Sequence, residues 1–139
     1  MTLKLQATPE EVMRAVEALQ EFASARGVPE KTVFSLALAL EECGSNIVNH
    51  ALRRDVQKTF QVVIEHTGST FVIELRDPGP EFDPTMAAER QPQAEDDDLP
   101  GGWGIQLVRR HLDEIRYKRE AGENVLRLTK LLGDAPAAK

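Results

Sequence analysis

The sequence predicts an α/β fold: a two-layer α+β sandwich with a mixed, mainly antiparallel sheet and helices on one face. Three observations predict it. Two long stretches within the first 52 residues repeat apolar side chains at helical spacing. Two short stretches rich in Val, Ile, Thr and Phe follow as a hairpin, and two further short strands close the chain. The resulting order, β-α-α-β-β-loop-α-β-β, is typical of helices packed on one face of a sheet.

Size and composition exclude several classes of protein. The 139 residues fit one domain, and contents of 41% hydrophobic and 29% charged residues are ordinary for a soluble globular protein. A net charge of −6 argues against direct nucleic-acid binding. The single cysteine, Cys43, excludes an internal disulfide and fits a reducing cytoplasm. Because neither a signal peptide nor an apolar run of ~20 residues is visible, we expect a cytoplasmic protein that does not enter membranes.

The N-terminal part predicts a short edge strand and then a helix. Leu3-Lys4-Leu5 alternates apolar and polar residues, as an edge strand does. Thr8 offers an N-cap oxygen, Pro9 suits the first helical position, and Glu11 follows the cap by three residues. Apolar residues then recur at helical spacing until Arg26-Gly27, where we expect the helix to end.

The rest of the chain predicts one more long helix, a hairpin, a short helix and two strands. A central helix should run from residue 28 to about residue 52, followed by a hairpin of residues 59–65 and 70–76. No pattern survives over 84–100, a length that is usually functional or mobile. A helix through Ile105, Val108 and Leu112 and strands at 114–117 and 125–128 complete one domain, residues 1–134; residues 135–139 look like a frayed tail.

The central helix carries a polar row beside its apolar stripe. Glu42, Asn46 and His50 are four residues apart and therefore share one face. Mg²⁺ takes few protein oxygens besides waters and phosphates, so the Asn46 carbonyl oxygen is a candidate ligand. Glu42 is a candidate base for a hydroxyl that attacks a phosphate. Taken alone, this row is more often a solvated helix face, and Cys43 beside it is core filler.

A second candidate segment follows the second strand of the hairpin. Asp77 would emerge at the end of the sheet, where its carboxylate can accept a hydrogen bond from an exocyclic amine such as that of adenine. Gly79 would let the backbone approach a ring closely, and Phe82 would form an apolar wall. A plain turn is an equally good interpretation of this stretch, since Asp, Pro and Gly are the usual turn residues.

A third candidate segment, Gly101-Gly102-Trp103-Gly104, precedes the helix that begins near Ile105. Successive glycine N–H groups at a helix start can close on phosphate oxygens, and Trp103 could shield a nucleotide. The alternative is a glycine-rich hinge. The segment is neither a Walker loop nor a Rossmann fingerprint, because no Gly-Lys-Ser/Thr is present and no strand leads into it.

In this order, the three segments resemble the motifs of the GHKL ATP-binding superfamily, which includes gyrase, MutL and sensor histidine kinases. Residues 38–51 resemble its N-box, residues 77–83 its G1 box and residues 102–108 its G2 box. Within the superfamily the chain is similar, over nearly its whole length, to the bacterial RsbW-like anti-sigma factor serine/threonine kinases. These share the Glu-x-x-x-Asn-x-x-x-His N-box and the Asp-x-Gly-x-x-Phe-Asp G1 box.

The resemblance implies a Bergerat-type fold that binds ATP and Mg²⁺. By position, Glu42 matches the catalytic base, Asn46 the Mg²⁺ ligand and Asp77 the adenine-binding aspartate. Residues 84–101 correspond to the ATP lid, although their acidic run, 95–98, offers few phosphate-binding residues. The other candidate nucleotide contacts are His50, Gly79, Phe82, Gly102, Trp103, Gly104 and Ile105.

The resemblance also implies partners. Such kinases phosphorylate a serine or threonine of a STAS-domain anti-anti-sigma protein, bind a sigma factor when not so engaged, and often form homodimers; we expect the same here. One alternative is a non-catalytic, nucleotide-gated module that sequesters a sigma factor or another regulator. Another is the catalytic domain of a split sensor histidine kinase. That would need a separate dimerisation helix with a phospho-accepting His, whereas His50, His66 and His111 lie inside the domain itself.

Overall fold

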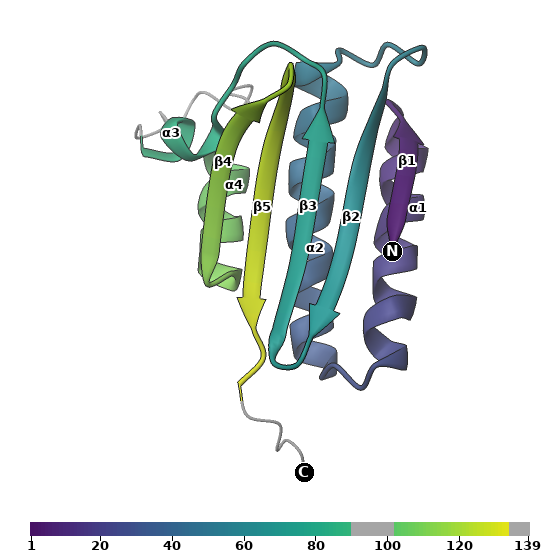
Figure 1. Cartoon of the computed structure of the whole chain (residues 1–139), viewed down its shortest axis with the longest axis vertical. Helices are drawn as coiled ribbons and strands as arrows, with labels where there is room; N and C mark the ends of the chain where they lie inside the picture. The colour runs from purple at the N-terminus through teal and green to yellow at the C-terminus, as the bar shows by residue number, and fades with distance from the viewer. Residues whose placement is uncertain (90–101, 134–139) are drawn as a thin grey trace.

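The structure, a computed structural model, describes residues 1–89 and 102–133 (Figure 1). The strands are β1 (Thr2–Gln6), β2 (Thr59–Thr67), β3 (Thr70–Asp77), β4 (Glu114–Glu120) and β5 (Glu123–Leu131). The helices are α1 (Pro9–Ala25), α2 (Glu30–Asn46), α3 (Pro84–Glu89) and α4 (Gly102–His111), with a π-helical turn, η1 (Ile47–Ala51), directly after α2. The strands form one layer, and α1, α2 and α4 pack behind it (Figure 1). The predicted two-layer α/β fold is confirmed.

The order of strands in the sheet is β1-β2-β3-β5-β4. Every neighbouring pair among these strands is antiparallel, so the described sheet is antiparallel throughout rather than mixed. Because the chain returns from α4 through the β4–β5 hairpin, β5 pairs with β3 in the middle of the sheet. This pairing sets Asn124, near the start of β5, directly opposite Asp77, at the end of β3.

The core lies between the helices and the inner face of the sheet. Alternation along β2 and β3 turns Val62, Ile64, Ile73 and Leu75 inward, and all four side chains are fully buried. The helices meet them with apolar stripes whose buried members include Leu19 of α1 and Leu36, Leu40 and Cys43 of α2. This stripe on α2 is the one that the sequence predicts, so the polar row beside it is held at a fixed orientation.

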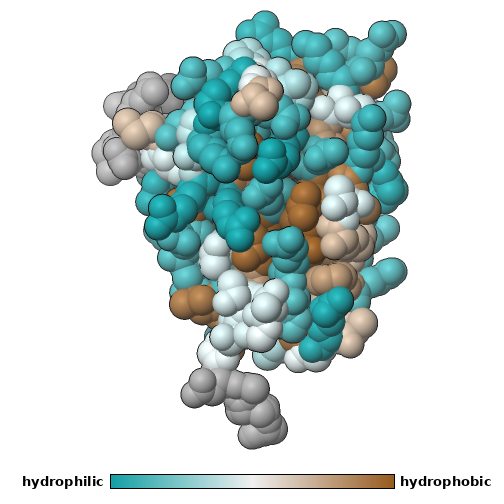
Figure 2. Space-filling view, in the orientation of Figure 1, coloured by the Kyte–Doolittle hydropathy of each residue, from teal (hydrophilic) through white to brown (hydrophobic). Residues whose placement is uncertain are grey.

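None of the helices in residues 1–89 and 102–133 covers the outer face of the sheet (Figure 1). Seen from this side, the surface is mainly hydrophilic, with a hydrophobic area toward its middle (Figure 2). Glu74 on β3 pairs with Arg76 (2.7 Å) and, across the strands, with Arg127 (3.2 Å). These pairs lie over Val72 and Val125, which share the outer face by register and are nonetheless buried.

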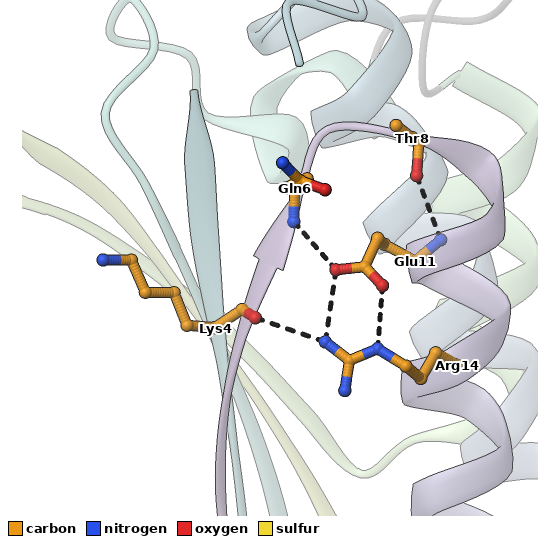
Figure 3. Close-up of polar contacts among 5 residues, drawn as sticks. All are labelled: Lys4, Gln6, Thr8, Glu11 and Arg14. Carbon is orange, nitrogen blue, oxygen red and sulfur yellow. Dashed lines mark hydrogen bonds and ion pairs between the residues drawn. The ribbon is translucent and has the colours of Figure 1, made fainter. Parts of the chain in front are cut away.

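Helix α1 begins as the sequence predicts, but its capping extends further back. The Thr8 hydroxyl oxygen accepts from the Glu11 N–H at 3.2 Å, and Pro9 occupies the first turn. The Glu11 carboxylate does not return to Thr8: it accepts the Gln6 N–H at 3.1 Å and pairs with Arg14 at 2.7 Å (Figure 3). Arg14 lowers the pKa of Glu11, and the Gln6 bond adds to this. Glu11 thus ties α1 to β1.

The prediction that 84–100 has no regular structure is wrong over its first six residues, which form α3. Asp83 caps this short helix: its carboxylate accepts from both the backbone N–H (2.9 Å) and the hydroxyl of Thr85. Pro84 occupies the first helical position. Residues 90–101, with the acidic run, and the tail at 135–139 lie outside the described residues. None of the described helices combines the length and apolar character that crossing a membrane requires.

Candidate functional site

A cavity of about 260 Å³ opens between the end of α2 and the ends of β3 and β5. Three sequence-distant regions meet in it: the α2–η1 helix, the segment after β3, and the β4–β5 hairpin. Four predicted site residues line it, namely Asn46, His50, Asp77 and Phe82. Cys43, Ile47, Ala51, Pro80, Glu81, Pro84, Tyr117, Asn124 and Leu126 complete the lining. Its volume is near the lower limit of typical small-molecule pockets.

Asp77 is the buried carboxylate of this cavity, with only 4% of its surface exposed. One carboxylate oxygen, Oδ1, accepts the Gly79 N–H at 2.8 Å and the Asn124 Nδ2–H at 3.0 Å. The other, Oδ2, has no hydrogen-bond partner among the described residues. Since Asp77 lines the cavity, Oδ2 is the acceptor that remains for a ligand. The sequence correctly places this carboxylate at the end of its strand.

Asn124 holds the segment after β3 in place, and the sequence analysis missed it. Its Nδ2 also donates to the Pro80 carbonyl at 2.9 Å, while its Oδ1 accepts from the Phe82 N–H at 3.1 Å and from the Tyr117 hydroxyl at 2.6 Å. Both hydrogens and both lone pairs of the carboxamide are therefore used. The backbone partners also fix which atom is oxygen, because Phe82 can only donate and Pro80 can only accept.

Two further groups on the β4–β5 hairpin support this arrangement. Arg119 donates to the Gly79 carbonyl at 2.7 Å, so the turn is bound from both strands of the hairpin. The hairpin closes with Ala121 and Gly122, whose φ angles of 54° and 81° suit a tight two-residue turn. Burial raises the pKa of Tyr117, so its hydroxyl keeps its proton and stays a donor to Asn124.

Gly79 lies so close to η1 that no side chain fits there. A Cβ at this position would stand 2.9 Å from the Ala51 carbonyl oxygen, 2.9 Å from Asp77 Oδ1 and 3.0 Å from the Ala51 Cβ. The Ala51 carbonyl oxygen belongs to the backbone, and Asp77 Oδ1 is held by two hydrogen bonds, so moving either atom aside would cost free energy. The close approach that the structure shows at Gly79 is made against η1, within the protein. The approach of this backbone to a ligand ring stays a prediction.

Replacing Gly79 with alanine is expected to lower the affinity for ATP, the ligand that the sequence resemblance implies, at least about tenfold and the stability by roughly 1–3 kcal/mol, because the new methyl group overpacks the turn beneath Asp77. The matched control is Gly68→Ala in the β2–β3 turn, where φ is +55°. That change should cost about 1–2 kcal/mol of stability through backbone strain but leave ATP affinity unchanged. Thermal unfolding and ATP titration of both variants make the comparison, and equal ATP affinities would contradict the account of Gly79.

The helix that carries Asn46 and His50 changes character at this site. The sequence predicts one continuous α-helix to about residue 52, whereas Ile47–Ala51 form a π turn in which the Leu52 N–H donates to the Ile47 carbonyl at 2.8 Å. Such turns often mark functional sites. The wider turn shifts His50 around the helix relative to Asn46, and His50 lines the cavity while remaining exposed to solvent.

The Asn46 carboxamide is left incompletely hydrogen-bonded within the protein. Its Nδ2 is the one buried side-chain nitrogen or oxygen among the described residues that lacks a hydrogen-bond partner. An orphaned amide in a cavity costs about 1–3 kcal/mol unless a ligand satisfies it. No group of three or more His, Cys, Asp or Glu side chains that could hold a metal occurs in the described parts of the chain. These residues fit Mg²⁺ bound by the Asn46 carbonyl oxygen and phosphate oxygens, since such a hard cation takes few protein ligands.

Glu42 stands one helical turn before Asn46 and is half-buried. It does not belong to the lining of the cavity, so the structure brings Asn46, His50, Asp77 and Phe82 together but places Glu42 beyond them along α2. Burial raises the pKa of the Glu42 carboxyl, and the negative charge of Glu41 raises it further. A carboxylate with a raised pKa is a better proton acceptor than an ordinary one.

The glycine segment forms the first turn of α4, which starts at Gly102 and therefore includes Trp103, Gly104 and Ile105. The glycines therefore lie at the start of the helix, as the sequence predicts, and the helix begins three residues before Ile105. Gly101 lies outside the described residues. Ser35 and His111 join α4 to α2 through Oγ and Nδ1, 2.9 Å apart. Arg109 donates to the Thr85 carbonyl at 3.2 Å and so ties α4 to α3 rather than pointing to a ligand.

Residues 5–130 match a protein family described as the histidine kinase-like ATPase domain. Over 130 residues the chain is 31% identical to the serine/threonine-protein kinase BtrW of Bordetella bronchiseptica, covering 92% of this chain and 91% of that protein.

Two solved structures are similar in fold. The RsbU and RsbW domains of Rv1364c from Mycobacterium tuberculosis match 95% of this chain with a TM-score of 0.68 and 20% identity; the match spans 32% of that longer chain. The SiaB–SiaC complex from Pseudomonas aeruginosa matches 93% of this chain and 88% of the other with a TM-score of 0.69 and 13% identity. At these identities the likeness concerns the fold.

Proposed function

Because the chain belongs to the histidine kinase-like ATPase family, the GHKL superfamily, we propose that it is an ATP-dependent serine/threonine protein kinase with anti-sigma activity. Its substrate would be a STAS-domain anti-anti-sigma protein, which receives the γ-phosphate. The observation that carries the proposal is the free Oδ2 of Asp77 in an otherwise largely apolar cavity. A ring with an exocyclic amine, such as adenine, satisfies that acceptor.

Different residues would bind the base and the phosphates of ATP. Asp77 would accept a hydrogen bond from the adenine amine, while Ile47, Leu126 and Phe82 would contact the faces and edges of the ring. The N–H groups of the first turn of α4, at Gly102 to Ile105, would bind phosphate oxygens at the positive end of the helix.

Asn46 would hold Mg²⁺, which, when bound, neutralises the charge that develops on the transferred phosphate. Glu42, one turn earlier on α2, would take the proton of the acceptor hydroxyl as that oxygen attacks. The position of Glu42 outside the base cavity supports this division, because the chemistry takes place at the far end of the triphosphate.

The rate of phosphoryl transfer is expected to rise with pH, with its half-maximum above the ordinary range of a glutamate, because Glu42 must be ionised and its pKa is raised. Replacing Glu41 with glutamine removes the negative charge that helps to raise the pKa of Glu42, so the pH at which the transfer rate rises should move lower. ATP titrates equally in both assays, so any difference between the two pH profiles reports on Glu42. A limb at the same pH in both proteins would contradict the assignment of Glu42.

The resemblance to RsbW-like kinases supports three further proposals: partner switching between the STAS protein and a sigma factor, a homodimer, and a single domain over residues 1–134. Co-purification from the native cell tests the partners, and sedimentation tests the dimer. Recovery of neither a STAS protein nor a sigma factor would contradict the proposed role in transcription.

Chemistry is tested by single-turnover transfer from ATP labelled at the γ-phosphate to the co-purified STAS protein. We expect label on a serine or threonine of that protein. A chain that binds ATP and the partner but transfers no label would instead be a nucleotide-gated binding module, and the kinase proposal would be wrong.

A further inference from the structure

We propose that Asn124 is a positioning residue that makes the cavity selective for a purine with an amine at C6, as in adenine, over a purine with a carbonyl oxygen there. The proposal rests on the function proposed above and concerns its specificity. Asn124 is 5% exposed and is one of three buried polar side chains in the described residues, together with Asp77 and Ser35. It does not line a core but a cavity, beside the carboxylate that would read the base.

Hydrogen bonds from two segments fix the orientation of the Asp77 carboxylate. Its Oδ1 receives two donors from different parts of the chain: the Gly79 N–H at 2.8 Å and the Asn124 Nδ2–H at 3.0 Å. Two donors on one oxygen fix the plane of the carboxylate and leave it no freedom to exchange its oxygens. Asp77 therefore always presents Oδ2 to the cavity, as an acceptor.

A hydrogen-bond acceptor at Asp77 Oδ2 discriminates between purines that carry an amine at C6 and purines that carry a carbonyl there. Adenine carries an amine at the position where hypoxanthine and guanine carry a carbonyl oxygen. An amine donates a hydrogen bond to Oδ2, whereas a carbonyl oxygen would place two acceptors face to face. A ligand that leaves a buried polar group of the site unpaired in this way binds much more weakly.

Asn124 also fixes the position of the segment that lines the cavity next to the base. It binds the Pro80 carbonyl (2.9 Å) and the Phe82 N–H (3.1 Å), and both residues line the cavity. One side chain thus fixes the acceptor and the adjoining wall together. The cross-strand register of Asp77 with Asn124 places it there.

The test compares the affinities of ATP, ITP and inorganic tripolyphosphate, which lacks a base, for three proteins in the presence of Mg²⁺. Asn124→Leu keeps the approximate size of the side chain but removes both donors to Asp77 and Pro80 without adding a charge beside Asp77. We expect ATP affinity to fall about 30-fold or more and the preference for ATP over ITP to fall at least about tenfold, while tripolyphosphate affinity changes less than about twofold. A merely structural role would move all three ligands together.

Ser35→Ala is the matched control, because it removes the hydrogen bond of another buried polar side chain, that of Ser35 with His111, outside the lining of the cavity. It should leave the preference for ATP over ITP within about twofold of that of the unchanged protein. If Asn124→Leu does not fold, Asn124→Ser, which keeps one donor, should lower the preference at least about threefold. In the unchanged protein, the Asn124 side-chain amide protons should exchange slowly with solvent, since both are bonded.

The outcomes separate this inference from the proposed function. A wild-type preference for ATP that survives in the folded Asn124 variants, or fast exchange of the Asn124 amide protons, would overturn the inference alone. Failure of the unchanged protein to bind any nucleotide would overturn the proposed function, and the inference with it.

Discussion

Replacing Glu42 with glutamine is expected to slow phosphoryl transfer by about 10²- to 10⁴-fold, the usual contribution of a general base, while ATP affinity stays within about twofold. The affinity should hold because Glu42 lies outside the cavity that receives the base. Folding should hold as well: glutamine has nearly the same shape, and the half-buried carboxylate it replaces has a raised pKa, so the charge is not stabilising the protein.

The matched control is Glu41→Gln, the neighbouring carboxylate on the same helix, which is exposed. Measured at a pH above the rising limb, its transfer rate should equal that of the unchanged protein. Single-turnover assays with saturating ATP give the rates, and thermal unfolding checks the fold. A Glu42→Gln protein that transfers phosphate at the unchanged rate would refute the role of Glu42 as the base.

Replacing Asp77 with asparagine is expected to weaken ATP binding at least about 30-fold and to reverse the preference between ATP and ITP. Gly79 and Asn124 both donate to one oxygen of residue 77, so an asparagine must turn its carbonyl oxygen toward them. Its NH₂ group then faces the cavity. Two donors would meet when adenine binds, whereas the carbonyl of hypoxanthine would find a partner.

The control for this change is Asp55→Asn, in an exposed turn where the carboxylate accepts only the Gln57 N–H. It should leave both nucleotide affinities unchanged. Calorimetric titration with each nucleotide and Mg²⁺ supplies the measurement. An Asp77→Asn protein that still prefers ATP would mean that Oδ2 is not the group that reads the base.

The sequence predicts elements well where local chemistry decides them. A capping side chain followed by proline marks the start of two helices: Thr8 and Pro9 precede α1, and Asp83 and Pro84 precede α3. Asp83 and Pro84 alone do not predict a helix, because the residues after them show no helical periodicity of apolar side chains. A helix of six residues is too short to display such a period.

The π turn at Ile47–Ala51 has no comparable signal. Apolar spacing distinguishes a helix from a strand, but one extra residue within a single turn leaves it almost unchanged. The turn lies instead where a distant segment packs: Gly79 approaches Ala51, which lies 28 positions earlier in the chain. Sequence reasoning therefore placed Asn46 and His50 on one face without the rotation that separates them.

Asn124 shows the limit of motif reasoning most clearly. Its neighbours, Glu123 and Val125, mark it only as part of a strand. Its importance arises from the antiparallel register that sets it opposite Asp77, 47 residues away. Such a pairing follows from the order of strands in the sheet, which the linear sequence does not display.

The central claim is that an adenine nucleotide occupies the cavity between α2 and the end of β3. A crystal structure with Mg²⁺ and a non-hydrolysable ATP analogue tests it most directly. The account predicts the base amine at hydrogen-bond distance from Asp77 Oδ2, the metal on the Asn46 carbonyl oxygen and the terminal phosphate on the side of Glu42. A cavity filled by its own side chains, or an analogue bound elsewhere, would contradict it.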